Sequence, residues 1–293
     1  MKMSSGPWFA AILLGVSLQW RLDGVCGQLP FPARRMRMIV TVEHESQLPE
    51  YVNLLEKYRG AINIASSYCY SVGPLEPASK LPDVNFCWKY FTQPLQQRVP
   101  EMHIHPIIQM GGDNAVHNFG RAEIFTKLFV AEALKSNYSG YFLDVEFHGD
   151  KHYENAKKYR DFLHVFGSGL HQHNKSMTVL SRSVDSHATP ASILNVIGGL
   201  DGFVVECDSH EVKLIDEFVR AMGYRFKPRG GALLYPHGEL NSKWSMQTVL
   251  TGMSTSGCQE LAFFANFQDM GAVMLDEMKR WLEGAYNITV PAP

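Results

Sequence analysis

Short apolar runs alternate with longer segments of helical spacing along most of the chain. Between residues 48 and 59 the apolar side chains fall on one helical face, namely Leu48, Tyr51, Leu54, Leu55 and Tyr58. The pattern predicts strands at 38–43, 61–70, 102–110, 140–147, 177–180, 202–205, 231–235 and 261–267. It predicts helices at 48–59, 118–136, 153–171, 190–197, 212–222, 244–253 and 270–281. Residues 71–100 form either an excursion over one face or a second helix with a loop.

This alternation indicates parallel strands joined by crossover helices. Eight such units in a chain of 293 residues predict a single-domain α/β fold, a (β/α)8 TIM barrel spanning residues 28–293. An open doubly wound sheet is the competing architecture, and it would usually carry a glycine-rich loop after its first strand. Residues 43–47 read E-H-E-S-Q there and contain no glycine, so neither a dinucleotide fingerprint nor a P-loop is present.

The fourth predicted strand, G-Y-F-L-D-V-E-F at 140–147, is apolar but carries two acids, Asp144 and Glu146. Side chains alternate along a strand, so Phe142, Asp144 and Glu146 share one face at intervals of roughly 6.5–7 Å. An unpaired buried carboxylate is costly. Either both acids lie at the strand exit, solvated or paired with Lys or Arg, or they form a functional pair. Two acids on one face of an apolar strand favour the functional pair.

Polar residues at the other strand exits would meet these acids, because strand ends converge on one pocket in a barrel. The exits supply Glu43, His44, Tyr70, Gln109, Asp144, Glu146, Ser181, Asp185, Glu206, Asp208, Tyr235 and Asn266. An acid-rich pocket with aromatic walls suits a sugar. We therefore expect the substrate contacts to come from Gln109, Glu206, Asp208, Tyr235 and Asn266.

The charge balance and the N-terminus narrow the class of protein further. A formal net charge of −2 gives no electrostatic case for binding nucleic acid or an anionic membrane. Lys2 precedes an apolar run at 8–18 that is too short to span a bilayer, and small residues precede Gln28. We expect residues 1–27 to be a signal peptide cleaved after Gly27, with an uncleaved anchor as the alternative. No later stretch approaches a membrane helix, so the mature protein is expected to be secreted or lysosomal.

Cysteine usage fits an oxidising compartment. Cleavage would leave Cys69, Cys87, Cys207 and Cys258, an even number that allows three pairings. Cys69 and Cys87 flank one loop, so that pair is favoured, and four buried free thiols are the alternative. Glycosylation sequons at Asn137, Asn174 and Asn287 also suit secretion.

Three strand-end motifs carry a resemblance to a known family. The fourth strand ends D-V-E-F, close to D-x-x-D-x-D-x-E, and the third ends Q-M-G-G, close to S-x-G-G. The sixth, F-V-V-E-C-D, stands where the family often has M-x-Y-D. With the order of the eight units, the chain resembles the family 18 glycoside hydrolases, that is, chitinases and chitinase-like proteins, over most of its mature length.

The resemblance implies hydrolysis of β-linked N-acetylglucosamine glycans without a cofactor or metal. In this family the N-acetyl oxygen of the sugar attacks the anomeric carbon, a substrate-assisted route with retention. Glu146 would be the general acid, and Asp144 would orient the acetamide and stabilise its developing positive charge.

The chain also departs from the family pattern. Ser139 and Phe142 replace the earlier acids of the signature, and Cys207 stands where a tyrosine usually binds the acetamide. The eighth strand contains Phe263, Phe264 and Phe267 but lacks the tryptophan that commonly forms the floor of the sugar-binding site in this family.

Three alternative functions therefore stay open. One is a chitinase-like lectin without turnover. A second is a two-carboxylate glycosidase with Glu206 as the nucleophile, whose distance from Glu146 would decide between retention and inversion. The third is a metal-dependent phosphodiesterase using His44, Asp144, Glu146 and His148. The pair His103 and His105 is expected to pack against the barrel and not to bind metal.

Overall fold

The computed structural model divides the chain into two compact units, Met1–Arg34 and Arg35–Pro293. It describes residues 35–40, 48–81, 87–146, 152–181, 200–206, 229–234, 247, 250–251, 260–265 and 272–283, all within the second unit. The expected signal peptide therefore lies outside the described residues. None of the helices in the described ranges is both long enough and apolar enough to cross a bilayer.

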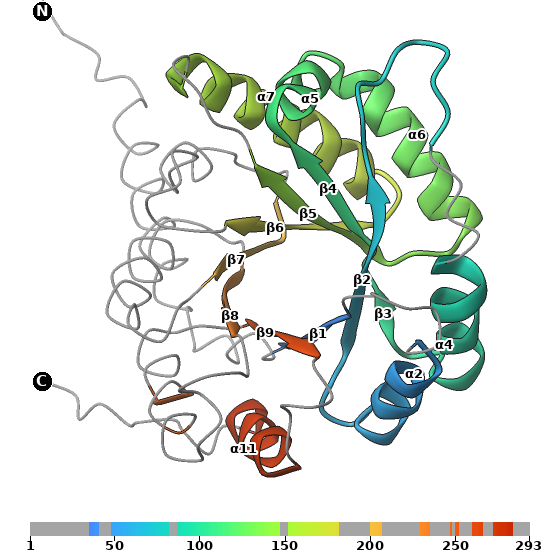
Figure 1. Ribbon diagram of the computed structural model, residues 1–293, viewed down its shortest axis with the longest axis vertical. Helices are drawn as coiled ribbons and strands as arrows, with labels where there is room; N and C mark the ends of the chain where they lie inside the picture. Colours follow the sequence, from blue (N-terminus) through green and yellow to red (C-terminus); the bar gives the residue numbers. More distant parts are fainter. Residues whose placement is uncertain are drawn as a thin grey trace, which may run out of the picture. The chain divides into compact units, whose positions relative to one another are not determined.

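A parallel sheet forms the centre of the second unit (Figure 1). Its strands are β1 (Arg35–Val40), β2 (Ile64–Ser71), β3 (His103–Ile104), β4 (Ile107–Gly111), β5 (Gly140–Glu146), β6 (Ser176–Ser181), β7 (Gly202–Glu206), β8 (Arg229–Leu234) and β9 (Glu260–Ala265). Their order is β1-β9-β8-β7-β6-β5-β4-β2-β3. β1 pairs in parallel with β9 on one side and with β2 on the other, and these pairings close the sheet into a ring. An open doubly wound sheet is thereby excluded, and the fold is of the TIM-barrel type.

Helices lie outside the strands and follow them in sequence (Figure 1). They are α2 (Leu48–Lys57), the π-helical turn η2 (Trp88–Thr92), α4 (Gln93–Arg98), α5 (Gly112–Phe119), α6 (Ala122–Lys135), α7 (His152–His171) and α11 (Ala272–Leu282). The helices expected at 190–197 and 212–222 fall outside the described residues. Of the helix expected at 244–253, Gln247, Leu250 and Thr251 are described and are helical.

Three predicted boundaries need correction. The first strand begins at Arg35 and not at Met38, because the charged Arg37 is buried in an ion pair within the strand, and the predicted end at Glu43 lies outside the described residues. The third strand is divided into β3 and β4 around Pro106, which has no N–H to donate to the sheet. The helix expected at 118–136 is two helices, and the first begins at Gly112, whose φ of +56° lets the chain turn directly out of β4. Residues 71–100 contain a second helix with a loop, one of the two predicted arrangements.

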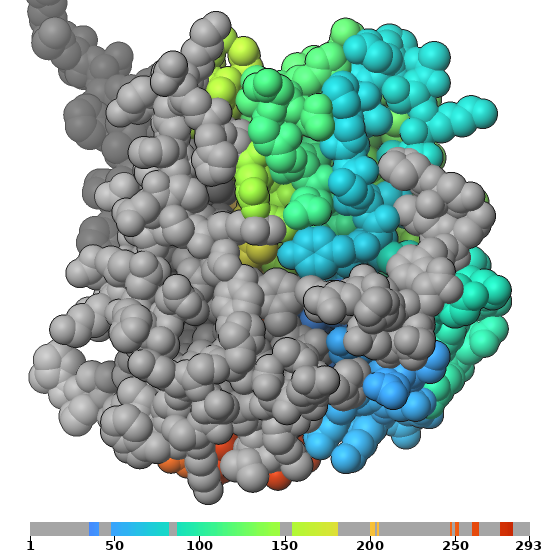
Figure 2. All heavy atoms as spheres, in the orientation of Figure 1, coloured from blue at the N-terminus to red at the C-terminus, as the bar shows by residue number. Residues whose placement is uncertain are grey.

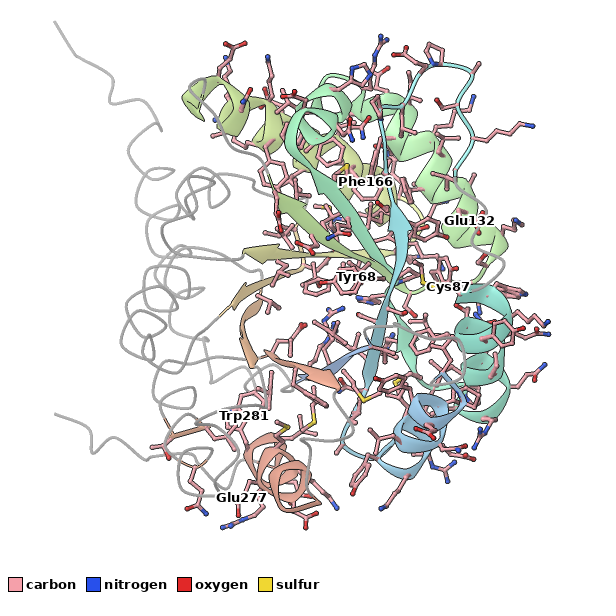
Figure 3. All side chains as sticks on the ribbon, in the orientation of Figure 1. Tyr68, Cys87, Glu132, Phe166, Glu277 and Trp281 are labelled. Carbon is pink, nitrogen blue, oxygen red and sulfur yellow. A yellow bond between two sulfur atoms is a disulfide. The ribbon has the colours of Figure 1, made fainter. Side chains whose placement is uncertain are left out.

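An aromatic core fills the space between β5 and helices α6 and α7. The ring centroid of Phe125 lies 4.4 Å from that of Phe129 in a tilted arrangement, and Phe129 packs edge-on against Tyr141 of β5 at 5.4 Å between ring centroids. Phe162 and Phe166 of α7 close the cluster, and Figure 3 shows Phe166 between the strands and the helices. Such edge-on pairs add about 0.5–1.5 kcal/mol each beyond the burial of their area.

A buried cation, Arg37 of β1, lies inside the ring of strands. Its Nε donates to Glu260 Oε1 of β9 at 2.6 Å, and its Nη1 donates to Ser66 Oγ of β2 at 2.9 Å. Its Nη2 donates to Thr178 Oγ1 of β6 at 3.0 Å. Arg37 and Glu260 are both buried, and leaving either charge unpaired would cost about 3–5 kcal/mol. Arg37 therefore ties together strands that are far apart in sequence.

His105, which follows β3, belongs to the same network. Arginine can only donate, so His105 Nδ1 accepts from Arg37 Nη1 at 3.2 Å, and Nε2 carries the proton toward Ser176 Oγ at 3.1 Å. Burial lowers the pKa of His105 well below its ordinary value, and the charge of Arg37 lowers it further. The expected packing is therefore confirmed for His105, which is buried and neutral, and wrong for His103, which is exposed.

The favoured disulfide is confirmed. Cys69 of β2 is bonded to Cys87, with 5.7 Å between their Cα atoms. The bond lies at an irregularity of the sheet, because Tyr68 pairs with Ile107 and Tyr70 with the next residue, Ile108. Cys69 is therefore the extra residue of a β-bulge. Cys207 and Cys258 lie outside the described residues.

Replacing Gly140 by alanine should destabilise the fold. A Cβ atom there would lie 2.2 Å from the carbonyl oxygen of Ser176 and 2.5 Å from its Oγ, so β5 and β6 would have to separate. We expect the free energy of unfolding in urea to fall by about 1–3 kcal/mol. Gly60→Ala is the matched control, because nothing lies within 4 Å of its Cβ position. Equal losses in the two variants would contradict the close packing of β5 on β6.

The neutral His105 predicts a loss of stability in acid. In the unfolded chain His105 takes up a proton near pH 6.5, whereas in the folded chain it stays neutral there. The stability that this difference contributes is therefore present above pH 6.5 and is lost as the pH falls below that value. We expect the free energy of unfolding to fall by about 1.4 kcal/mol per pH unit below that point. His105→Gln, which cannot titrate, should show a flatter dependence in urea titrations at pH 7.5 and 5.5. Parallel dependences in the two proteins would contradict this.

Candidate active site

The interior of the barrel above Arg37 is apolar. Side chains from different strands meet there, namely Ile39, Ile107, Phe142, Leu180, Val204 and Ala262. The guanidinium of Arg37 lies 4.6 Å from the centroid of the Phe142 ring, a cation–π contact between the polar network and this interior cluster. Phe142 therefore faces inward, as the strand pattern predicts.

Asp144 follows Phe142 on the same face of β5, one step nearer the carboxyl ends of the strands. It is fully buried. Its neighbours in register are Gln109 of β4 and Leu180 of β6, and the hydroxyl of Tyr68 donates a hydrogen bond of 3.2 Å to its Oδ2. Because a carboxylate buried among apolar side chains needs polar partners, this hydrogen bond helps to hold Asp144 in the interior.

Glu146 is the last residue of β5 and lies opposite Gly111 of β4. It is half-buried, in contrast to Asp144. Alternation along the strand brings it to the same face as Asp144, at the rim of the barrel. A half-buried acid at the carboxyl ends of the strands is placed to reach a bound molecule, with a buried acid directly behind it.

Gln109 of β4 lies next to Asp144 through their register in the sheet. It is half-buried, and its backbone oxygen accepts a hydrogen bond of 3.0 Å from Val72 N beyond the end of β2. Glu206 ends β7, two residues after Val204 of the interior cluster. The other predicted site residues, Asp208, Tyr235 and Asn266, lie outside the described residues, as do Glu43, His44, His148 and Asp185.

Tyr70, which the sequence places among the strand exits, does not belong to this site. The bulge at Cys69 turns it outward, where its ring packs 5.2 Å from Phe129 and its hydroxyl lies 3.4 Å from that of Tyr138. Burial raises the pKa of Tyr70, so its hydroxyl stays protonated. The inward tyrosine is Tyr68, which packs against the interior cluster, and Figure 3 shows it within the ring of strands.

The segment after β2 is fixed beside the site by Asn118 of α5, a residue that the sequence reasoning did not single out. Asn118 is buried, its Oδ1 accepts from Leu75 N at 2.9 Å, and its Nδ2 donates to Gly73 O at 3.0 Å. Figure 2 shows atoms of this segment against those of α5. An asparagine on the buried face of an amphipathic helix was the available signal, since such a group must find hydrogen-bond partners.

The described ranges contain no group of three or more His, Cys, Asp or Glu side chains arranged to hold a metal ion. Of the four residues considered for a metal site, only Asp144 and Glu146 are described. The chemistry that the described residues offer is that of two neighbouring carboxyl groups of different exposure, with a phenol hydroxyl and an amide next to the buried one.

The sequence matches no protein-family model and no curated protein. Solved structures do match the fold. A chitinase from Bacteroides thetaiotaomicron superposes with a TM-score of 0.65 at 9% identity, covering 89% of this chain and 100% of that one. A chitinase from Chromobacterium violaceum gives 0.63 at 11% identity, with 85% and 99% coverage. The chitinase-like agglutinin of Robinia pseudoacacia gives 0.62 at 11% identity, with 85% and 100% coverage.

Proposed function

We propose that this protein is a divergent family 18 glycoside hydrolase that cleaves β-linked N-acetylglucosamine glycans with retention. The observation that carries the proposal is the position of the two acids on β5. Asp144 is buried inside the ring of strands, and Glu146 follows it on the same face, half-buried at the rim. The strand-end motifs and the fold shared with chitinases support it. The complete (β/α)8 alternation over residues 28–293 is part of the proposal.

Glu146 acts as the general acid in this mechanism. Its half-exposed position lets the carboxyl reach the glycosidic oxygen of a sugar bound at the strand ends and protonate it as the bond breaks. The N-acetyl oxygen of the same sugar attacks the anomeric carbon, so no protein nucleophile is needed. Glu146 then takes a proton from the water that opens the cyclic intermediate, which returns the acid to its starting state.

Asp144 holds the acetamide. A carboxylate oxygen accepts the N–H of the acetamide and turns its carbonyl oxygen toward the anomeric carbon. The negative charge also stabilises the positive charge that develops on the acetamide, and the buried position strengthens this interaction. Gln109, next to Asp144, adds a polar contact to the sugar. Glu206, Asp208, Tyr235 and Asn266 complete the proposed substrate contacts.

A sugar-binding protein without turnover is the second candidate. One observation favours it: Phe142 occupies the position of a family acid, and its ring packs in the interior cluster against Arg37. Asp144 therefore has no carboxyl neighbour at that position. The agglutinin among the structural neighbours is chitinase-like in name and fold. The intact Asp144–Glu146 pair is the reason for placing hydrolysis first.

We propose that the protein works outside the cytosol, either secreted or in the lysosome, after removal of residues 1–27. The Cys69–Cys87 disulfide supports this compartment, because such bonds persist under oxidising conditions. The sequon residues Asn137 and Asn174 are exposed on turns with positive φ, where a glycan would find room, which supports a glycoprotein. The proposed partner is a glycan, with no nucleic acid and no membrane segment in the mature chain.

Glu146→Gln should abolish most of the hydrolysis of a chitooligosaccharide. The amide keeps the shape of the side chain but cannot give up a proton, so we expect kcat to fall about 10²–10⁴-fold with KM little changed. Glu56→Gln is the control, because Glu56 is an exposed residue of α2 paired with Arg98. Product release is followed by chromatography.

Full activity of Glu146→Gln would overturn the assignment of the acid. If the wild-type protein binds the oligosaccharide in calorimetry but releases no product, the sugar-binding candidate replaces hydrolysis.

A further inference from the structure

A tyrosine takes over a supporting role at Asp144 that the signature gives to a carboxyl group. We infer that Tyr68 is a positioning residue whose hydroxyl holds the Asp144 carboxylate in its working orientation. The inference rests on the proposed function and names a residue that none of the strand-end motifs contains.

The first observation is the contact itself. Tyr68 OH donates to Asp144 Oδ2 at 3.2 Å from β2, which β4 separates from β5 in the sheet. A hydrogen bond to an ionised group is worth about 1.5–3 kcal/mol, more than one between neutral groups. With Oδ2 engaged by the phenol, the carboxyl plane is fixed and Oδ1 is oriented by the protein instead of by the substrate.

The second observation is the residue that precedes Asp144 on the inward face of β5. Phe142 fills the preceding inward position with a ring that contacts Arg37, so no side chain there can share a proton with Asp144. A donor from another strand meets the same need, which is to stabilise the carboxylate while the acetamide becomes positively charged.

The third observation is the way β2 aims the two tyrosines. The bulge at Cys69 separates Tyr68, which faces inward, from Tyr70, which faces the aromatic core. The disulfide to Cys87 anchors the bulge residue to the start of the helical segment η2. Bulges often occur beside active sites, where they redirect a side chain. The disulfide at the neighbouring residue therefore fixes the position from which the Tyr68 hydroxyl donates its hydrogen bond to Asp144.

Tyr68→Phe tests the role, with Tyr70→Phe as the matched control on the same strand. Loss of the Tyr68 hydroxyl should lower kcat about 10–100-fold, the equivalent of one hydrogen bond to a charged group, with KM changed less than threefold. The acidic limb of the pH profile of kcat should move to higher pH, because the carboxylate loses a donor. Tyr70→Phe should leave kcat and the pH profile unchanged. If Tyr68→Phe keeps the wild-type kcat and the wild-type pH profile, the positioning role of Tyr68 is wrong although hydrolysis stands.

A second readout needs no turnover. In infrared difference spectra, the carboxylate band that disappears in Asp144→Asn should shift in frequency in Tyr68→Phe and stay in place in Tyr70→Phe. If the wild-type protein hydrolyses nothing, a shifted band still supports the positioning role and only the proposed function fails. An unshifted band overturns the positioning role whether or not the protein is active.

Discussion

The closed sheet depends on the buried guanidinium of Arg37. A cation in this position must have its charge paired and its donors engaged, and it reaches Glu260 of β9, Ser66 of β2 and Thr178 of β6 to do so. Each of these hydrogen bonds fixes the position of one strand, along its length, relative to β1. His105 and Ser176 extend the network toward β5, where Gly140 leaves room for Ser176.

The interior is layered as a result. The polar network lies lowest, the apolar cluster around Phe142 lies above it, and Asp144 and Glu146 lie above that cluster. Within this layer Phe142 contacts Arg37 and precedes Asp144 on the same face of β5. A carboxylate at position 142 would lie close to a guanidinium already paired with Glu260, so the phenylalanine there and the buried ion pair are mutually consistent. Of the two acids, Asp144 accepts a hydrogen bond from Tyr68 and lies in register with Gln109.

The sequence predicted those parts in which local pattern and burial agree. β5 was placed with its acids on the inward face, α7 ends at His171 as expected, and the Cys69–Cys87 pair is formed. The start of β1 was wrong, because a charged residue in a strand becomes reasonable only once its partner, 223 positions away, is known. Tyr70 was counted among the strand exits and Tyr68 was not considered, because a bulge changes the facing of side chains without any mark in the residue pattern. Asn118 was missed because its partners are backbone groups of a distant loop.

In the proposed function, Asp144 and Glu146 carry out hydrolysis assisted by the substrate's own acetamide. The most direct measurement is proton NMR of the first product released when the protein is mixed with a chitooligosaccharide. We expect the β-anomer to form first and then to equilibrate, since attack by the acetamide and then by water gives net retention. Release of the α-anomer first would show a single displacement by water and would contradict the mechanism, and the absence of any product would contradict hydrolysis itself.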